Sequence, residues 1–236
     1  MSWWWPFQKK QTLAESGILR GMTDYHSHLL PGVDDGVQTV EESLEILRLY
    51  EQLGIQEVWF TPHIMEDIPN TTAGLCTRFE QFQKHYTGNI RLHLAAEYML
   101  DNLFKERLAH RDLLPIGEEG NHLLVETSYF NPPMDLYGMM EKIKSAGFIP
   151  VLAHPERYTY MGEKEYHRLK ETGVMFQSNL PSLAGNYGKH VLHKVRHFSV
   201  QGYTDIWGTD THRLQVLNSI VTSPCLIKEI FIKNAI

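Results

Sequence analysis

The feature that most constrains the fold of this chain is a regular alternation of short apolar runs with segments of helical periodicity. Strand-length runs such as GMTDYHSH, EVWFT and FIPVLAH are each followed by a segment whose apolar residues recur every three or four positions. About seven such strand–helix units follow one another, without a low-complexity linker or an internal repeat. Strict alternation of this kind requires a parallel sheet, either open and doubly wound or closed into a barrel.

The expected elements fill most of the chain, and at 236 residues it is long enough for one α/β barrel. The expected strands cover residues 21–28, 57–61, 90–98, 122–128, 148–154, 174–179 and 204–210. The expected helices cover residues 39–54, 72–86, 101–110, 134–146, 164–172, 189–200 and 216–232. We therefore predict a single domain over residues 21–236, preceded by an N-terminal tail over residues 1–20.

The tail begins MSWWWPFQKKQ, and its apolar run is too short for the core of a signal peptide or for a membrane span. Three tryptophans beside two lysines are compatible with a peripheral contact to a membrane surface or to a partner. A tail that folds against its own domain, or that is disordered, is the favoured interpretation. No other stretch approaches the roughly 18 apolar residues that a membrane helix needs.

Charge and cysteine content narrow the function classes. The net charge is −6 and no basic run is long enough to follow a nucleic-acid backbone, so we expect no nucleic-acid partner. The two cysteines, Cys76 and Cys225, are far apart and lie in no metal-type pair. This pattern favours a reduced, cytoplasmic protein. Whether it forms homo-oligomers is left open.

Most of the predicted strands end in side chains that can bind a metal ion. A barrel brings the C-terminal ends of its strands to one face, where residues far apart in sequence converge. A single strand-end histidine is more often a structural residue, but many such residues at corresponding positions indicate a common site, since buried charges persist when they are paired or metal-bound. The predicted ligands are His26, His28, Asp35, His63, Glu97, Glu126, His154, Asp210 and His212.

This donor set indicates several cations. Five histidines and four carboxylates are too many for one ion, and their mixture without thiolates favours manganese, iron or zinc. We expect two or three divalent ions; three would outweigh the four carboxylates by about two charges and attract a phosphate dianion. Such a site suits hydrolysis by a metal-bound hydroxide. We expect turnover to depend on His154, Asp210 and Arg157, the last through a bidentate contact to phosphate. For Arg213 a phosphate contact and a surface role remain open.

The motifs HSHLLPGVDDG, TPH, AAEY, LVET, AHPERY and TDTH, in this order, resemble the polymerase and histidinol phosphatase (PHP) superfamily. Within it they are similar to the metal-dependent tyrosine phosphatases of bacterial capsule and exopolysaccharide clusters, over a match from about Met22 to His212. The resemblance implies a distorted, TIM-like (β/α)7 barrel with a trinuclear site, often containing manganese. The nine predicted ligands match the family's ligand positions, and Arg157 matches its proposed phosphate-binding arginine. Family members commonly carry another basic residue beyond the last motif, where this chain has RLQVLNS, which leaves substrate preference open.

We therefore expect a metal-dependent phosphomonoesterase that acts on phosphotyrosine. The resemblance implies that its partner is the tail of a tyrosine kinase that controls capsular or exopolysaccharide production. Neither cysteine is followed by five residues and an arginine, which excludes a cysteine-dependent tyrosine phosphatase. The alternatives are a small-molecule phosphatase, for example one acting on histidinol phosphate, and a scaffold protein with a degenerate site.

Overall fold

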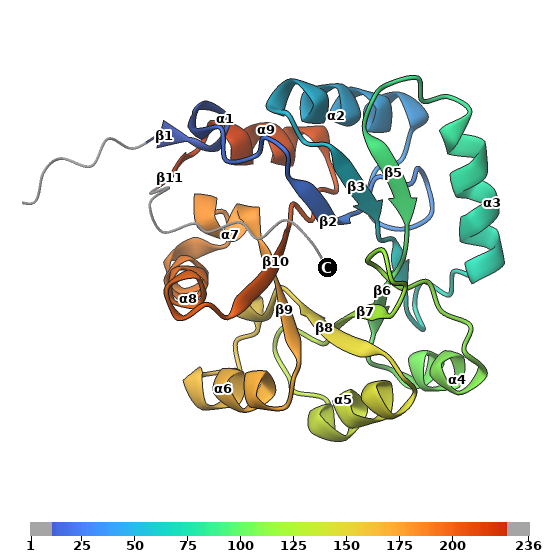
Figure 1. The fold of residues 1–236 in the computed structure, drawn as a ribbon, viewed down its shortest axis with the longest axis vertical. Helices are drawn as coiled ribbons and strands as arrows, with labels where there is room; N and C mark the ends of the chain where they lie inside the picture. The colour runs from blue at the N-terminus through green and yellow to red at the C-terminus, as the bar shows by residue number, and fades with distance from the viewer. Residues whose placement is uncertain (1–10, 226–236) are drawn as a thin grey trace, which may run out of the picture.

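Parallel strands close into a barrel in the computed structural model, which describes residues 11–225 (Figure 1). The strands of its wall are β2 (Thr23–Ser27), β3 (Glu57–Phe60), β4 (His63–Ile64), β5 (Arg91–Leu94), β6 (Glu97–Met99), β7 (His122–Glu126), β8 (Ile149–Ala153), β9 (Met175–Asn179) and β10 (Thr204–Gly208). They are ordered β2-β3-β5 in one sheet and β4-β6-β7-β8-β9-β10 in the other, and each neighbouring pair is parallel.

The ring closes between its first and last strands. The backbone N–H of His28 donates to the carbonyl of Thr211 (3.0 Å), and that of Asp210 donates to the carbonyl of His26 (2.8 Å). Since β3 continues into β4 and β5 into β6, the nine strands form seven members of one wall. The predicted distorted (β/α)7 barrel is confirmed.

Two of the predicted strands are each broken into two. The run 57–61 ends at Phe60, and the chain resumes as β4 after Pro62, which has no N–H to donate to a ladder. The run 90–98 breaks in the same way at Ala95 and Ala96. After the breaks the two segments pair again as β4 and β6, with His63 directly opposite Glu97. The breaks thus bring two predicted metal ligands side by side.

Helices follow the strands and lie outside the wall (Figure 1). The longer ones are α2 (Val40–Leu53), α3 (Thr72–Gln83), α4 (Asn102–His110), α5 (Leu136–Ser145), α6 (Glu163–Glu171), α8 (Gly188–Gln201) and α9 (Leu214–Thr222). Local sequence sets their ends: on α2, Thr39 Oγ1 accepts from the N–H of Glu42 (3.2 Å), and Gly54 ends the helix with φ +84°.

The prediction of a last helix over residues 216–232 is wrong at both ends. Helix α9 begins at Leu214 and ends at Thr222, since Pro224 disfavours a helical conformation at the residue before it. Pro224–Cys225 instead forms strand β11, which pairs antiparallel with β1 (Gln11–Thr12). The remainder of the predicted helix, 226–232, lies outside the described residues.

Part of the predicted N-terminal tail packs on the barrel. Short helix α1 (Leu13–Ser16) lies beside α9, and both Leu13 and Leu19 are buried in the main core (Figure 1). The boundary at residue 21 stays a prediction, and the tryptophan-rich segment lies outside the described residues. Among residues 11–225, no helix is both long enough and apolar enough to cross a membrane.

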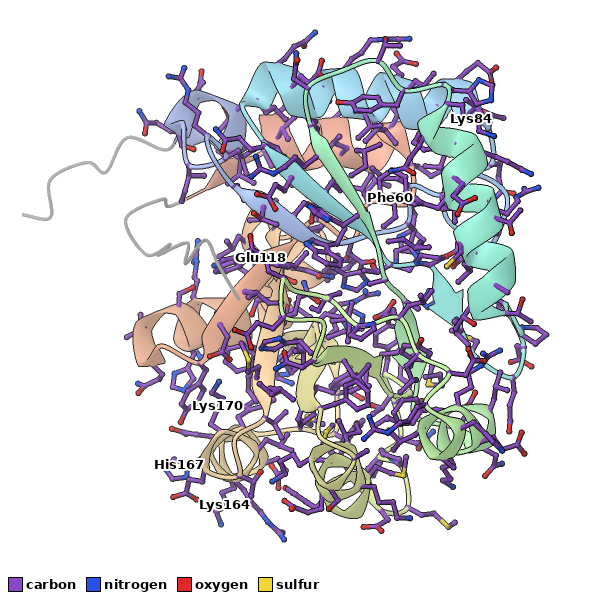
Figure 2. All side chains as sticks on the ribbon, turned by 45° about the vertical axis from the view of Figure 1, so that its right-hand side comes forward. Phe60, Lys84, Glu118, Lys164, His167 and Lys170 are labelled. Carbon is purple, nitrogen blue, oxygen red and sulfur yellow. The ribbon has the colours of Figure 1, made fainter. Side chains whose placement is uncertain are left out.

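Two apolar clusters stabilise the barrel. The larger one fills the space between wall and helices, where Phe60 is buried, whereas Lys164 and His167 lie on the outer surface at α6 (Figure 2). The smaller one lines the inside of the barrel. Its member Leu124 precedes Glu126 by two residues in β7 and so shares its face of the strand. The barrel interior is therefore apolar below the predicted ligands.

Gly208 permits the close approach of β10 to β2. A Cβ atom at this position would lie 2.5 Å from His26 Cβ and 2.8 Å from Gln177 Nε2. We expect Gly208→Ala to reduce the free energy of unfolding by roughly 1–3 kcal/mol, because one strand must move to relieve the overlap. Urea denaturation of the two proteins measures the difference. An unchanged midpoint would contradict this account of the closure.

Candidate metal centre

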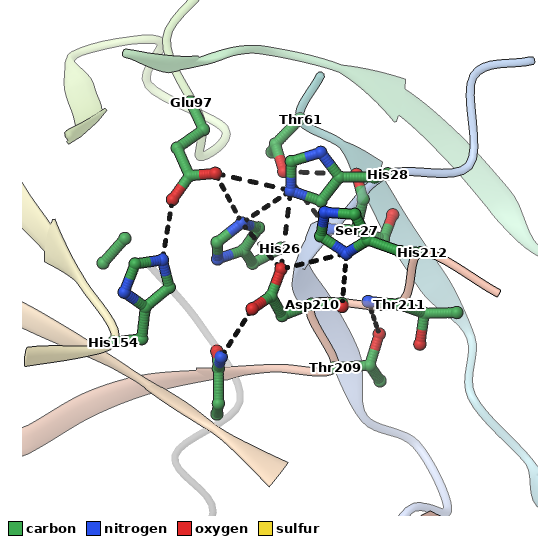
Figure 3. Close-up of polar contacts among 12 residues, drawn as sticks. His26, Ser27, His28, Thr61, Glu97, His154, Thr209, Asp210, Thr211 and His212 are labelled. Carbon is green, nitrogen blue, oxygen red and sulfur yellow. Dashed lines mark hydrogen bonds and ion pairs between the residues drawn. The ribbon is translucent and has the colours of Figure 1, made fainter. Parts of the chain in front are cut away.

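All nine predicted ligands lie at the C-terminal end of the barrel, in four overlapping groups (Figure 3 shows most of them). In each group one ligand atom from every member lies within 4.8 Å of the others. The groups are His28 with Asp35, His63 and His212; His26 with His28 and Asp210; His26 with Glu97 and His154; and His63 with Glu97 and Glu126. Because members are shared, the groups form one continuous cluster.

Glu97 is the residue on which the histidines converge. Its Oε2 lies 3.1 Å from His26 Nε2 and 3.3 Å from His28 Nε2, and its Oε1 lies 3.0 Å from His154 Nε2 (Figure 3). The same Oε2 lies 3.2 Å from His63 Nδ1. Burial raises the pKa of this carboxyl, but the imidazoles of His26 and His63 outweigh burial and hold its pKa well below the usual range. A buried, ionised carboxylate with both oxygens facing imidazoles has the geometry of a bridging ligand.

The donor atoms fit cations. The Nε2 atoms of His26 and His28 face each other at 3.1 Å. Nδ1 of His63 is buried and makes no hydrogen bond of good geometry, although carboxylate oxygens of Glu97 (3.2 Å) and Glu126 (3.1 Å) lie beside it. A buried nitrogen left without a partner is costly, and a cation shared with the nearby carboxylates would satisfy it. Imidazole and carboxylate donors without thiolates fit manganese, iron or zinc. These residues therefore fit a site for more than one divalent ion.

Asp210 connects the cluster with Arg157. Its Oδ1 lies 3.4 Å from His212 Nδ1 and 3.5 Å from His28 Nε2, while its Oδ2 accepts from Asn179 Nδ2 (2.7 Å) and from Arg157 Nη1 (2.8 Å). The two oxygens of this carboxylate thus have different neighbours: Oδ1 faces imidazoles, and Oδ2 accepts hydrogen bonds from Asn179 and Arg157.

Backbone strain is concentrated in the same place. Asp210 (φ +51°) and His154 (φ +35°) have left-handed backbones, which non-glycine residues seldom adopt; among the described residues Arg111 alone shares this property. Strain of this kind persists where the surroundings impose it, and it gathers at functional sites. It aims both side chains from the strand ends into the cluster.

The two aspartates of the VDDG motif have different surroundings. The Asp35 side chain is 67% exposed, with Oδ1 3.6 Å from His63 Nε2 and 3.5 Å from His212 Nε2. The Asp34 side chain is fully buried; its Oδ2 accepts from His28 Nδ1 (2.9 Å) and from the backbone N–H of His63 (3.0 Å). Sequence reasoning missed Asp34, although its place beside Asp35 was a signal. It orients two of the predicted ligands.

Gln177 was missed in the same way. Its Oε1 lies 2.8 Å from His26 Nδ1. Since an amide oxygen only accepts, Nδ1 carries the proton and Nε2 remains free to face the cluster. The signal was present: Gln177 and Asn179 occupy alternate positions of the buried strand β9, so both point to one face.

A cavity of about 470 Å³ opens onto the cluster, within the range typical of small-molecule sites. Besides predicted ligands, Arg157 lines it, together with the apolar or aromatic side chains of Met65, Met99, Tyr129, Tyr187 and Val216. The Arg213 guanidinium instead donates to the backbone oxygens of Gly36 and His212. The structure thus brings Arg157, but not the Arg213 head group, to the cavity.

Metal-stripped protein is expected to lose thermal stability as the pH is raised from about 6.5 to about 9. Burial lowers the pKa of His26, but the carboxylates of Glu97 and Asp210 outweigh burial and raise that pKa from 6.5 to about 9. The folded state therefore holds this proton more tightly than the unfolded state does. The resulting stabilisation is complete below pH 6.5 and disappears as the pH rises through about 9.

Thermal melting of chelator-treated protein across this window measures the effect, and His26→Gln should reduce it without abolishing it, because the pKa values of His28 and His63 are raised as well. A melting temperature that stays constant or rises over the same window would contradict the prediction.

Comparison with known proteins adds a family model described as capsular polysaccharide synthesis, CpsB/CapC, which matches residues 22–219. The chain is 31% identical over 177 residues to the tyrosine-protein phosphatase YwqE of Bacillus subtilis, covering 72% of this chain and 69% of that protein. It is 26% identical over 206 residues to the tyrosine-protein phosphatase CpsB of Streptococcus pneumoniae, covering 82% and 84% respectively.

Solved structures agree with this similarity. One of them superposes on this chain with a TM-score of 0.75 at 25% identity. It comes from work on YwqE from Bacillus subtilis and CpsB from Streptococcus pneumoniae, which are described as unique metal-dependent tyrosine phosphatases. The match covers 88% of this chain and 84% of that one. A lactonase from Listeria monocytogenes superposes with a TM-score of 0.56 at 11% identity, which is a likeness of fold alone.

Proposed function

The chain belongs to the CpsB/CapC family of capsular polysaccharide synthesis, and from this premise we propose that it removes phosphate from phosphotyrosine at the centre described above. It is a metal-dependent tyrosine phosphatase related to YwqE and CpsB. The observation that carries the proposal is the overlap of four ligand groups, two of which contain Glu97, at a cavity that Arg157 lines.

We assign metal binding to the nine clustered side chains, with two or three ions and manganese as the expected metal. When bound, such ions lower the pKa of a coordinated water so that it can attack phosphorus, and they neutralise charge on the phosphoryl oxygens. Asp34 and Gln177 hold the imidazoles of His28 and His26 with their Nε2 atoms toward the cluster. These contacts fix the ligand geometry before a cation arrives.

The remaining steps belong to protein side chains and to the leaving group. Arg157 contacts the phosphate through the N–H groups that Asp210 leaves free. A tyrosine phenolate has a pKa near 10, so it departs with less help from a general acid than an alkoxide needs. We therefore expect aryl phosphates to be hydrolysed faster than alkyl phosphates.

The finer substrate and its location are also proposals. We infer that the phosphotyrosine lies in the tail of a kinase that controls polysaccharide production, because related phosphatases belong to capsule synthesis. We place the reaction in the cytoplasm, where the free thiol of Cys76 is expected to persist.

Phosphate release from a phosphotyrosine peptide and from histidinol phosphate tests this function. Metal-stripped protein should be inactive on both, and added Mn²⁺ should restore turnover of the peptide with a clear preference over histidinol phosphate. The reverse preference would identify a small-molecule phosphatase. Inactivity on both substrates with metal bound would indicate a scaffold.

Replacing Arg157 with alanine should lower kcat/KM for the peptide by about 10–100-fold, the loss expected for a hydrogen-bonded charged contact. The loss should appear mainly in KM and leave the metal content unchanged. Steady-state kinetics measure it, and Arg213→Ala is the matched control, expected to change kcat/KM by less than about threefold. Equal effects of the two variants would remove the distinction between the arginines.

A further inference from the structure

Two tyrosine rings lie against the Arg157 guanidinium. The centroid of the Tyr129 ring and that of the Tyr187 ring each lie 4.3 Å from Arg157 Cζ. The rings come from separate parts of the fold, since Tyr129 follows β7 and Tyr187 precedes α8. All three side chains line the cavity above the metal centre.

The edges of the same guanidinium remain available. Nη1 donates to Asp210 Oδ2 (2.8 Å), which is the one side-chain hydrogen bond that Arg157 makes within residues 11–225. The side chain is 20% exposed. Since the N–H groups of a guanidinium lie in its plane, rings that stack on its faces leave the edges to meet a ligand.

The segment that carries the arginine also holds one of the tyrosines. The carbonyl of Tyr129 accepts from the N–H (2.9 Å) and from the hydroxyl (3.0 Å) of Thr159, two residues beyond Arg157. On its other side the Tyr129 ring lies against Tyr158, with centroids 6.0 Å apart. Tyr129 is therefore fixed relative to the backbone from which Arg157 projects.

We propose that Tyr129 and Tyr187 are positioning residues that hold Arg157 edge-on to the phosphate of the substrate. The inference rests on the proposed function, in which Arg157 contacts that phosphate. A guanidinium without the two rings is free to turn two N–H groups onto the carboxylate of Asp210, the bidentate geometry that arginine favours. The rings oppose that rotation, so part of the fork stays directed at the cavity.

A second role for the same rings predicts different kinetics. If the rings instead packed against the phenyl ring of the substrate, their loss would weaken the binding of aryl phosphates and leave the binding of alkyl phosphates unchanged. If the rings act through Arg157, their loss weakens the binding of aryl and alkyl phosphates equally. It then has no further effect in a variant that lacks Arg157. Phenyl phosphate and glycerol phosphate are probes that separate these cases.

The experiment compares Tyr129→Leu and Tyr187→Leu with Tyr129→Phe and Tyr187→Phe, each alone and combined with Arg157→Ala. Each leucine variant should raise KM for both probes by about 2–30-fold, the range expected from losing one cation–π contact. Both phenylalanine variants should behave like the wild type, because the ring remains. In the Arg157→Ala background the leucine changes should add nothing, and metal content should be constant throughout.

Tyr137→Leu is the matched control, because Tyr137 stacks on Arg168 (3.7 Å) between α5 and α6 without lining the cavity. It should leave KM unchanged. The proposal is overturned if the leucine variants lose activity on phenyl phosphate alone, if their effect persists without Arg157, or if KM does not change.

Calorimetric titration with inorganic phosphate separates failure of this inference from failure of the proposed function. If the wild type hydrolyses neither probe, the proposed function fails, and the effect of the rings is still read from the Kd of phosphate. Weaker phosphate binding by the leucine variants supports the positioning role, and equal binding overturns it.

Discussion

Replacing Glu97 with glutamine should lower kcat on a phosphotyrosine peptide by about 1,000-fold or more and reduce the amount of bound metal. Both carboxylate oxygens face imidazole nitrogens, at 3.0 Å from His154 and 3.1 Å from His26. An amide has the same shape but carries no charge, and its NH2 group would point at a cation or at an imidazole N–H. Initial rates and elemental analysis of the purified variant measure the two effects.

A control for this change is Glu141→Gln. Glu141 is exposed on α5 and pairs with Lys144, so its loss should alter neither turnover nor metal content. If Glu97→Gln retained its metal and turned over at a rate near that of the wild type, the placement of Glu97 at the centre of the site would be wrong.

The second large effect, on stability, is expected at Asp34, the residue before the predicted ligand Asp35. Asp34→Asn should reduce the free energy of unfolding by about 3–5 kcal/mol, because it breaks a fully buried ion pair with His28. Burial raises the pKa of Asp34, but the His28 imidazole outweighs burial and holds that pKa well below its usual range, so the carboxylate is ionised in the folded protein. Metal affinity should also fall about 10–100-fold, as expected when the partner of a ligand is lost.

Asp35→Asn provides the contrast within the same motif. Asp35 is mostly exposed, so this variant should keep the stability of the wild type while its turnover falls. Thermal melts and metal titrations of the two variants measure the difference. Equal losses of stability would contradict the division of roles between an orienting aspartate and a ligand.

The sequence alone was sufficient to predict the barrel and the set of side chains that gathers at its mouth. Alternating apolar runs indicate a parallel sheet, and the family resemblance implied that the sheet closes into a barrel. A closed wall brings all strand ends to one face. Residues as distant in the chain as His26 and Asp210 were grouped on that ground, and their ligand atoms are neighbours.

What escaped prediction depends on contacts rather than on periodicity. Ala95 and Ala96 carry no local signal for a break, because the break follows from re-pairing with a neighbouring strand. Buried partners such as Asp34 were missed because residue type and position beside a ligand do not distinguish the ligand itself from the residue that orients it. The last helix was extended too far because its apolar periodicity was weighted above the proline that follows it.

Closure of the wall between β2 and β10 has a consequence for the order of events during synthesis. The ribosome delivers His26 and His28 early, but Asp210 and His212 only with the last strand of the wall. A nascent chain that still lacks β10 exposes unpaired strand edges and an incomplete set of ligands. Contacts between such distant segments also form slowly. The two ligand groups that contain Asp210 or His212 are thus completed last, when the ring closes.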